Sequence, residues 1–147
     1  MAEEINERVR RLIDGANLAH VATLDADGAP RVQPTWVSTD GDTVWLNTQQ
    51  GRIWPERLRR DGRVALSIVN AADPTEYTEI TGRVREETTA GAIEHIDAVS
   101  RVYTGGDYPA HFEGEVRVIF KIEPERIRYV NLMERIPGIP PDALPAR

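Results

Sequence analysis

Hydrophobic and polar residues follow two different periods along this chain. Ile5, Val9, Leu12 and Ile13 recur at helical spacing and predict an amphipathic N-terminal helix that ends at Gly15. Later runs of branched and aromatic residues, separated by Asp, Gly and Pro, predict strands joined by turns. The expected strands cover residues 18–24, 31–38, 43–48, 63–70, 75–87, 115–122 and 126–130, with further helices at 52–60 and 90–103.

Turn residues predict how these strands connect. Asp-Gly turns at residues 25–28 and 40–42 join the first three strands, which favours a meander with tight connections. Pro34 within the second strand indicates an edge or a bulge, and Gly82 within the fifth indicates a bulge or a bend. Six or seven strands without alternating helices predict a mainly β (α+β) fold, namely an antiparallel barrel with peripheral helices.

The chain length of 147 residues predicts one domain, which we expect to cover residues 1–133. Residues 134–147 contain four prolines and form a Pro-rich C-terminal tail. Such a tail is expected to be neither a helix nor a central strand. It is either loose or an extended arm laid on a neighbouring molecule.

Composition and charge narrow the class of protein. A net charge of −6 argues against a nucleic-acid partner, because such proteins present a basic face. No run of residues reaches the apolar length of a membrane span, and the charged N-terminus is not a secretory signal, so we expect a cytoplasmic protein. Cysteine is absent, and His20, His95 and His111 are far apart in sequence, so no metal site is expected.

An excess of arginine stands out in residues 46–66, LNTQQGRIWPERLRRDGRVAL. A polar turn with Gly51 leads into a helix start, where free backbone N–H groups and the helix dipole favour an anion. Arg52 and Arg57 add planar donors that suit phosphate oxygens. Trp54 lies beside them and either packs in the core, stacks on a planar cofactor or covers a neighbouring subunit. The alternative interpretation is a solvated basic helix face paired with nearby acids.

The order of motifs along residues 5–130 resembles the flavin reductase split-barrel superfamily, to which pyridoxamine 5′-phosphate oxidase belongs. Within it, the chain is most similar to the actinobacterial branch of deazaflavin (coenzyme F-420)-dependent reductases of the B group. The segments that carry the resemblance are DGAPR at residues 27–31, VWLNT, GR at 51–52, LRRDGRVAL, YTEITGRV, IDAVSRVYTGGDYP and GEVRVIFKIEPERI.

This resemblance implies a homodimer of split β-barrels with cofactor sites at the subunit interface. The cofactor phosphate would be held by the turn and helix start, and the ring system would lie against the second strand. By this pattern the phosphate residues are Thr48, Gln49, Gln50, Gly51 and Arg52, and the ring residues are Gln33, Pro34 and Thr35.

One position departs from the family pattern. Trp54 stands where the family commonly has a phosphate-binding lysine, two residues after Arg52. Arg57, one helical turn further on, is our hypothesis for the compensating cation. It predicts that Arg57→Ala weakens cofactor binding much more than Arg60→Ala.

The resemblance implies an oxidoreductase that uses reduced coenzyme F-420 to transfer a hydride to an unsaturated small-molecule acceptor. Arg57, Arg59 and Arg60 would suit the oligoglutamate tail that distinguishes this coenzyme from flavin mononucleotide (FMN). The alternatives are an FMN-binding oxidase or flavin reductase of the same fold, and a non-catalytic cofactor- or tetrapyrrole-binding protein. Tyr77 and Tyr103 are the candidate proton donors.

Overall fold

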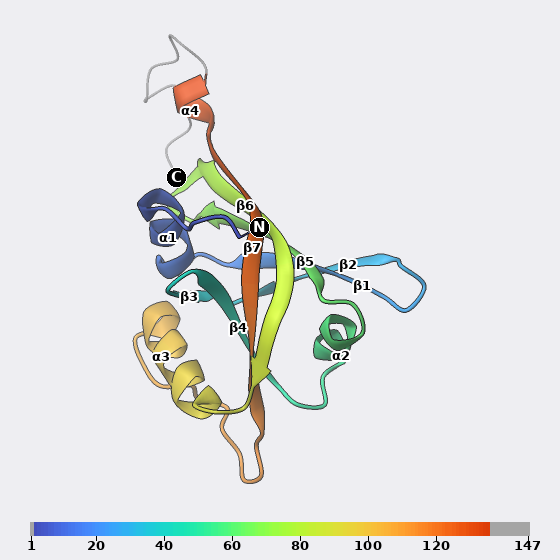
Figure 1. The fold of residues 1–147 in the computed structure, drawn as a ribbon. Coiled ribbons are helices and arrows are strands. Elements are labelled where there is room, and N and C mark those ends of the chain that lie inside the picture. The colour runs from blue at the N-terminus through green and yellow to red at the C-terminus, as the bar shows by residue number, and fades with distance from the viewer. Residues whose placement is uncertain (1, 136–147) are drawn as a thin grey trace.

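In the computed structural model, which describes residues 2–135, seven strands form one antiparallel sheet in the order β2-β1-β5-β6-β7-β4-β3 (Figure 1). The strands are β1 (Ala19–Leu24), β2 (Pro30–Thr35), β3 (Ser38–Asp40), β4 (Thr43–Gln49), β5 (Arg63–Asn70), β6 (Asp73–Thr88) and β7 (Arg117–Asn131). The helices are α1 (Glu7–Asp14), α2 (Ile53–Arg60), α3 (Ala92–Thr104) and α4 (Leu132–Arg135).

The sheet coils around a single core. Figure 1 shows β1 and β2 running across the direction of β4 and β7, so that the two halves of the sheet face each other. Val21 and Leu66 from one half, and Leu46 and Phe120 from the other, are at most 1% exposed. Burying each such side chain stabilises the fold by about 2 kcal/mol. The predicted antiparallel split barrel with peripheral helices is therefore confirmed.

The predicted meander of the first three strands is wrong. The β1–β2 hairpin forms as expected, and β2 is an edge strand, which explains how Pro34 is accommodated. However, the predicted strand 31–38 breaks after Thr35, and the chain crosses to the opposite edge of the sheet. There β3 pairs with β4, and β4 pairs with β7 rather than with β2. Turn residues predicted the local reversals correctly but carried no information about long-range pairing.

β6 and β7 form the long central pair, and the bend predicted at Gly82 is confirmed. The pairing register shifts between Thr81 and Gly82, opposite Pro124. A Cβ atom at Gly82 would lie 2.1 Å from the Glu123 carbonyl oxygen, so the close approach requires glycine. The prediction of two separate strands at 115–122 and 126–130 is wrong, because β7 continues through Pro124 at this irregularity.

Helices cover the open parts of the barrel. Asn6 caps α1 by accepting a hydrogen bond from the Val9 N–H, and α1 buries the apolar face predicted for it. α4 extends to Arg135 and so includes the first two residues of the predicted tail, and Glu134 forms an ion pair of 3.2 Å with Arg8. The rest of the predicted tail, residues 136–147, lies outside the described residues. None of the helices described is long and apolar enough to cross a membrane.

Candidate functional site

The predicted anion-binding turn forms between β4 and α2. Gly51 has a positive φ of +92°, a conformation that favours glycine, and the Gln50 N–H donates to the Val116 carbonyl oxygen. Arg52 is the N-cap residue of α2, and its side chain makes no capping hydrogen bond. The first N–H groups of α2 therefore have no acceptor within the helix, and the positive end of its dipole points the same way.

The arginines of this segment differ in whether they are already paired. Among residues 2–135, Arg52 and Arg60 have no hydrogen-bond or ion-pair partner. Arg57 donates through Nε to Asp25 Oδ1 at 2.9 Å, so the cation that we expected to compensate for Trp54 is engaged by a carboxylate. Arg59 is also engaged, by Glu87, Gln50 and Glu56. The alternative interpretation of a basic helix face paired with acids therefore describes two of the four arginines.

A shallow hollow of about 470 Å³, here called the α2 hollow, lies beside this helix. The arginines Arg52, Arg57 and Arg60 and the acids Asp25, Asp27 and Glu56 line it. Arg31 and, to a smaller extent, Arg57 lower the pKa of Asp25, which therefore stays ionised. Positive and negative groups are balanced in this hollow.

A second hollow of about 270 Å³, here called the Arg117 hollow, lies on the other side of Arg52. It is lined by the predicted ring residues Pro34 and Thr35, by Trp36, Asn47 and Arg117, and by Arg52, which lines both hollows. No Asp or Glu lines this second hollow. The structure thus brings Pro34, Thr35, Gly51, Arg52 and Arg57 together around two adjoining hollows, whereas Gln33 lines neither.

Thr48 and Trp54, two residues of the predicted site, are both buried. Thr48 is 1% exposed, and its Oγ1 is the one buried side-chain polar atom among residues 2–135 that has no hydrogen-bond partner. A buried unpaired hydroxyl is costly, but Thr48 lines neither hollow and lies on the same face of β4 as the core residues Val44 and Leu46, so a ligand in either hollow does not reach it. Trp54 is 7% exposed and packs in the core, 6.2 Å from the Phe120 ring centroid, and it lines neither hollow.

The two remaining turn residues predicted for the phosphate are Gln49 and Gln50. Gln49 is partly buried at the end of β4, where it pairs with Arg117 of β7. Gln50 is exposed, and its Oε1 accepts a hydrogen bond from Arg59. Neither residue lines either of these two hollows.

The two candidate proton donors are placed differently. The Tyr103 hydroxyl donates to the Asn17 carbonyl oxygen at 2.7 Å and accepts from the Val37 N–H, and burial raises its pKa. Its proton is thus committed to the backbone, although its ring stacks on Trp36, which lines the Arg117 hollow. Tyr77 lies on β6 and lines neither hollow.

Sequence reasoning missed Arg117 and the residues that hold it. Polar and apolar residues alternate along residues 115–118, a pattern that predicts Arg117 on the face opposite the core. However, α3 and the loop 105–116 cover that face, and the Arg117 side chain is only 3% exposed. Its Nε donates to Asn47 Oδ1 at 2.7 Å, and its Nη1 donates to Glu115 Oε1 at 2.9 Å. The spacing of Glu115 and Arg117 on one strand face could have indicated their ion pair, but the same spacing is equally typical of a solvated strand face.

The same network fixes the state of His95. Because Asn47 Oδ1 accepts from Arg117, Asn47 Nδ2 must donate to His95 Nδ1, at 3.0 Å. The proton of the neutral ring is then on Nε2, which donates to Ser38 Oγ at 2.9 Å. Burial, assisted by the charge of Arg117, lowers the pKa of His95 to about 4. Nε2 therefore cannot accept the Ser38 proton, and the Ser38–His95 pair is not an activated nucleophile.

His111 has the opposite environment. Its Nδ1 lies 2.6 Å from Glu115 Oε2 and its Nε2 lies 2.7 Å from Asp97 Oδ1. These two carboxylates raise its pKa, and the imidazolium ties the loop 105–116 to α3. Within the described part of the chain, no three His, Asp or Glu side chains gather as a set of metal ligands.

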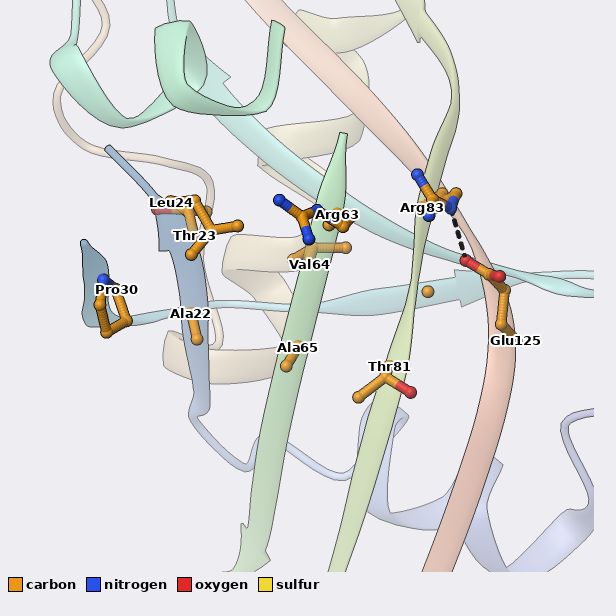
Figure 2. A pocket seen from close by; sticks show the side chains of 11 residues that line it. Ala22, Thr23, Leu24, Pro30, Arg63, Val64, Ala65, Thr81, Arg83 and Glu125 are labelled. Atoms are coloured by element: carbon orange, nitrogen blue, oxygen red, sulfur yellow. Dashed lines mark ion pairs between the residues drawn. The ribbon is translucent and has the colours of Figure 1, made fainter. Parts of the chain in front are cut away.

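A third hollow, of about 340 Å³, lies on the outer face of the sheet (Figure 2). Its floor consists of small side chains, Ala22, Ala65 and Thr81, which are neighbours across β1, β5 and β6. Figure 2 shows Arg83 at the rim, paired with Glu125. The exposed Val32 side chain continues the same row on β2, opposite Ala22. This face is mostly apolar and carries no unpaired carboxylate in its lining.

A coiled antiparallel sheet with an arginine-rich helix start beside an edge strand defines a split-barrel protein of the flavin-binding type. The profile of the pyridoxamine 5′-phosphate oxidase family matches residues 5–131, so the chain belongs to this family. Members of the family are commonly oxidoreductases, and the fold binds flavin-type cofactors. No curated protein matches the sequence.

Solved structures show the same fold at low sequence identity. An F420 reductase is 22% identical, with a TM-score of 0.73, over 81% of this chain and 94% of that chain. A putative pyridoxamine 5′-phosphate oxidase of Listeria innocua is 23% identical, with a TM-score of 0.65, over 87% of this chain and 99% of that one. A conserved hypothetical protein of Mycobacterium tuberculosis is 18% identical, with a TM-score of 0.68, over 95% and 92%.

Proposed function

We propose that this protein is an oxidoreductase that uses reduced coenzyme F-420 to transfer a hydride to an unsaturated small-molecule acceptor. The observation that carries the proposal is the unpaired Arg52 side chain at the uncapped start of α2, where free backbone N–H groups and the helix dipole favour an anion. In the described part of the chain, Arg52 and these N–H groups lack the partner that a phosphate-bearing ligand supplies. The family, in which flavin-type cofactors are bound, supports this assignment.

The residues of this chain would act by binding and orienting. Arg52 and the first N–H groups of α2 would hold the phosphate, with Arg60 at the far side of the α2 hollow. Pro34 and Thr35 would support the ring system at the edge of the Arg117 hollow. The bound coenzyme supplies the hydride, and the protein supplies position and electrostatics. The Tyr103 hydroxyl would hold the backbone at Asn17 and Val37 rather than donate a proton.

FMN is the second candidate cofactor, and one observation favours it. Arg57 and Arg59, two of the three arginines that suited the oligoglutamate tail, are paired with carboxylates. Arg60 alone of these three remains free among the described residues. With FMN the protein would be an oxidase or a flavin reductase of the same fold.

We further propose that the protein is a homodimer whose cofactor sites lie at the subunit interface. Apolar side chains that are unusually exposed for their type line both hollows, with Leu18 46% exposed at the Arg117 hollow and Ile53 73% exposed at the α2 hollow. A second subunit would cover them, as well as the apolar outer face that contains the third hollow.

The test is a fluorescence titration of the purified protein with coenzyme F-420 and, separately, with FMN. Arg52→Ala removes one charge-assisted contact and is expected to weaken binding of the preferred cofactor by about ten-fold or more. The matched control is Arg126→Ala, an exposed β7 residue outside the site, which should leave the affinity unchanged. Including Arg57→Ala and Arg60→Ala tests whether the arginine paired with Asp25 contributes at all.

Each outcome of the titration decides between the alternatives. Micromolar or tighter binding of coenzyme F-420 alone supports the proposed reductase, and turnover with a panel of unsaturated acceptors then follows. Preference for FMN moves the assignment to the oxidase or flavin reductase. Binding of neither cofactor refutes the enzyme proposal and leaves the non-catalytic or tetrapyrrole-binding alternative.

A further inference from the structure

The Arg117 hollow differs from the α2 hollow in its charge. Two arginines, Arg52 and Arg117, line it, and no carboxylate does. The α2 hollow instead combines three arginines with three acids. A small anion that enters the Arg117 hollow therefore meets positive charge without a competing carboxylate in the lining.

Arg117 is held in one position, with one of its three guanidinium nitrogens unused. Its Nε and Nη1 are bound to Asn47 and Glu115, and its guanidinium lies 4.9 Å from the centroid of the Tyr108 ring. Nη2 donates to no atom of residues 2–135. Among residues 2–135, Thr48 Oγ1 is the one fully buried side-chain polar atom without a hydrogen-bond partner. Nη2 also has no partner within these residues, so it must be accessible to solvent, and Arg117 lines the hollow. An arginine fixed in this way binds an oxygen with little loss of side-chain entropy.

The charged groups around Arg117 do not add a net negative charge to the hollow. Glu115 is shared between Arg117 and His111, and His111 is shared between Glu115 and Asp97. With His111 protonated, this chain of four groups is neutral, so in the cofactor-free protein Arg52 gives the hollow a net positive charge. The remaining walls are apolar or aromatic, namely Leu18, Trp36, Ile96 and Tyr108.

We propose that the Arg117 hollow binds a small planar carboxylic acid, with the carboxylate on Arg117 and the conjugated part against the aromatic wall that Trp36 and Tyr108 form, and that this acid is the acceptor class of the enzyme. The volume of about 270 Å³ is below the ~300–1,000 Å³ of pockets for drug-sized ligands, which favours a ligand of one ring or less. The acceptor role rests on the proposed oxidoreductase function, whereas the binding site itself does not.

The test is isothermal titration calorimetry of the full-length protein, free of cofactor, with benzoate and with the uncharged benzyl alcohol. We expect benzoate to bind at least ten-fold more tightly, because a charge-assisted hydrogen bond to Arg117 is available only to the carboxylate. Arg117→Lys keeps the charge but loses the planar fork, and it should weaken benzoate binding by about ten-fold. Arg126→Lys, the same exchange on the exposed part of β7, should have no effect.

The outcomes separate this proposal from the proposed function. Equal affinity for benzoate and benzyl alcohol in the wild type overturns the carboxylate site, and this comparison stands even if Arg117→Lys fails to fold. A repeat of the titration with saturating cofactor tests the acceptor role: retained benzoate binding supports it, and displacement by the cofactor overturns it. Binding of benzoate without binding of any flavin-type cofactor would instead refute the oxidoreductase proposal and leave the anion site standing.

Discussion

Replacing His95 by glutamine tests whether burial keeps this imidazole neutral and makes the protein sensitive to acid. In the folded state its pKa is lowered to about 4, first by burial and second by the charge of Arg117. In the unfolded chain the pKa returns to its ordinary value of about 6.5. As the pH falls through 6.5, the unfolded state takes up a proton that the folded state does not, so stability should decline between pH 6.5 and pH 4.

The size of this decline follows from the change in pKa. A fall from 6.5 to about 4 corresponds to about 3 kcal/mol of unfolding free energy. Because the His95 side chain is only partly buried, solvent screening reduces this value, and we expect about 2 kcal/mol. Single domains are stable by only about 5–15 kcal/mol, so a loss of this size is readily measured.

Urea denaturation at several pH values between 7.5 and 4.5 provides the assay. The unfolding free energy of the wild type should fall relative to that of His95→Gln, which cannot titrate but retains a donor for Ser38 and an acceptor for Asn47. His111→Gln serves as the opposite control, because Glu115 and Asp97 raise the pKa of His111 and its contribution is lost as the pH rises through that value. Parallel pH curves for the wild type and His95→Gln would refute the reasoning.

Two further predictions concern stability at fixed pH. Gly82→Ala places a Cβ atom 2.1 Å from the Glu123 carbonyl oxygen and should cost about 1–3 kcal/mol or more in urea denaturation, whereas Gly62→Ala, with its nearest atoms at 3.7 Å, should be tolerated. Equal midpoints for the two variants would contradict the tight β6–β7 approach. Trp54→Lys restores the lysine expected from the family pattern, but it should destabilise the fold by about 3–5 kcal/mol without tightening cofactor binding, because residue 54 faces the core. A stable variant with higher affinity would show instead that this position reaches the phosphate.

Local elements were well determined by the sequence. The helical periodicity of residues 5–13, the turn at Asp25–Gly28 and the glycine in the middle of β6 each act through neighbours within a few residues, so their effects are visible in the pattern itself. The same holds for Gly51 and Arg52 at the start of α2, which the structure places at the junction of two hollows. Features of this kind depend on backbone sterics and short-range hydrogen bonds.

The sequence did not determine which charged side chains are paired or buried. Arg57 and Arg52 look alike in the sequence, but Asp25, at the tip of the β1–β2 hairpin, pairs with Arg57 and not with Arg52. Arg117 resembles an ordinary strand arginine, but α3 and the loop 105–116 bury it against Asn47, seventy residues away in the chain. These pairings depend on contacts between segments that are remote in sequence, which no local pattern encodes.

The sequence by itself therefore determined the antiparallel barrel, most of its helices and strands, and the turn that suits a phosphate. Only the tertiary structure decided that β4 pairs with β7, that Trp54 belongs to the core, and that Arg52 and Arg117 are the arginines facing an acid-free hollow. The physical reason is that burial and charge pairing are properties of three-dimensional neighbours. The hydrophobic periodicity indicates on which face of a helix or strand a residue lies, but only the tertiary structure shows what covers that face.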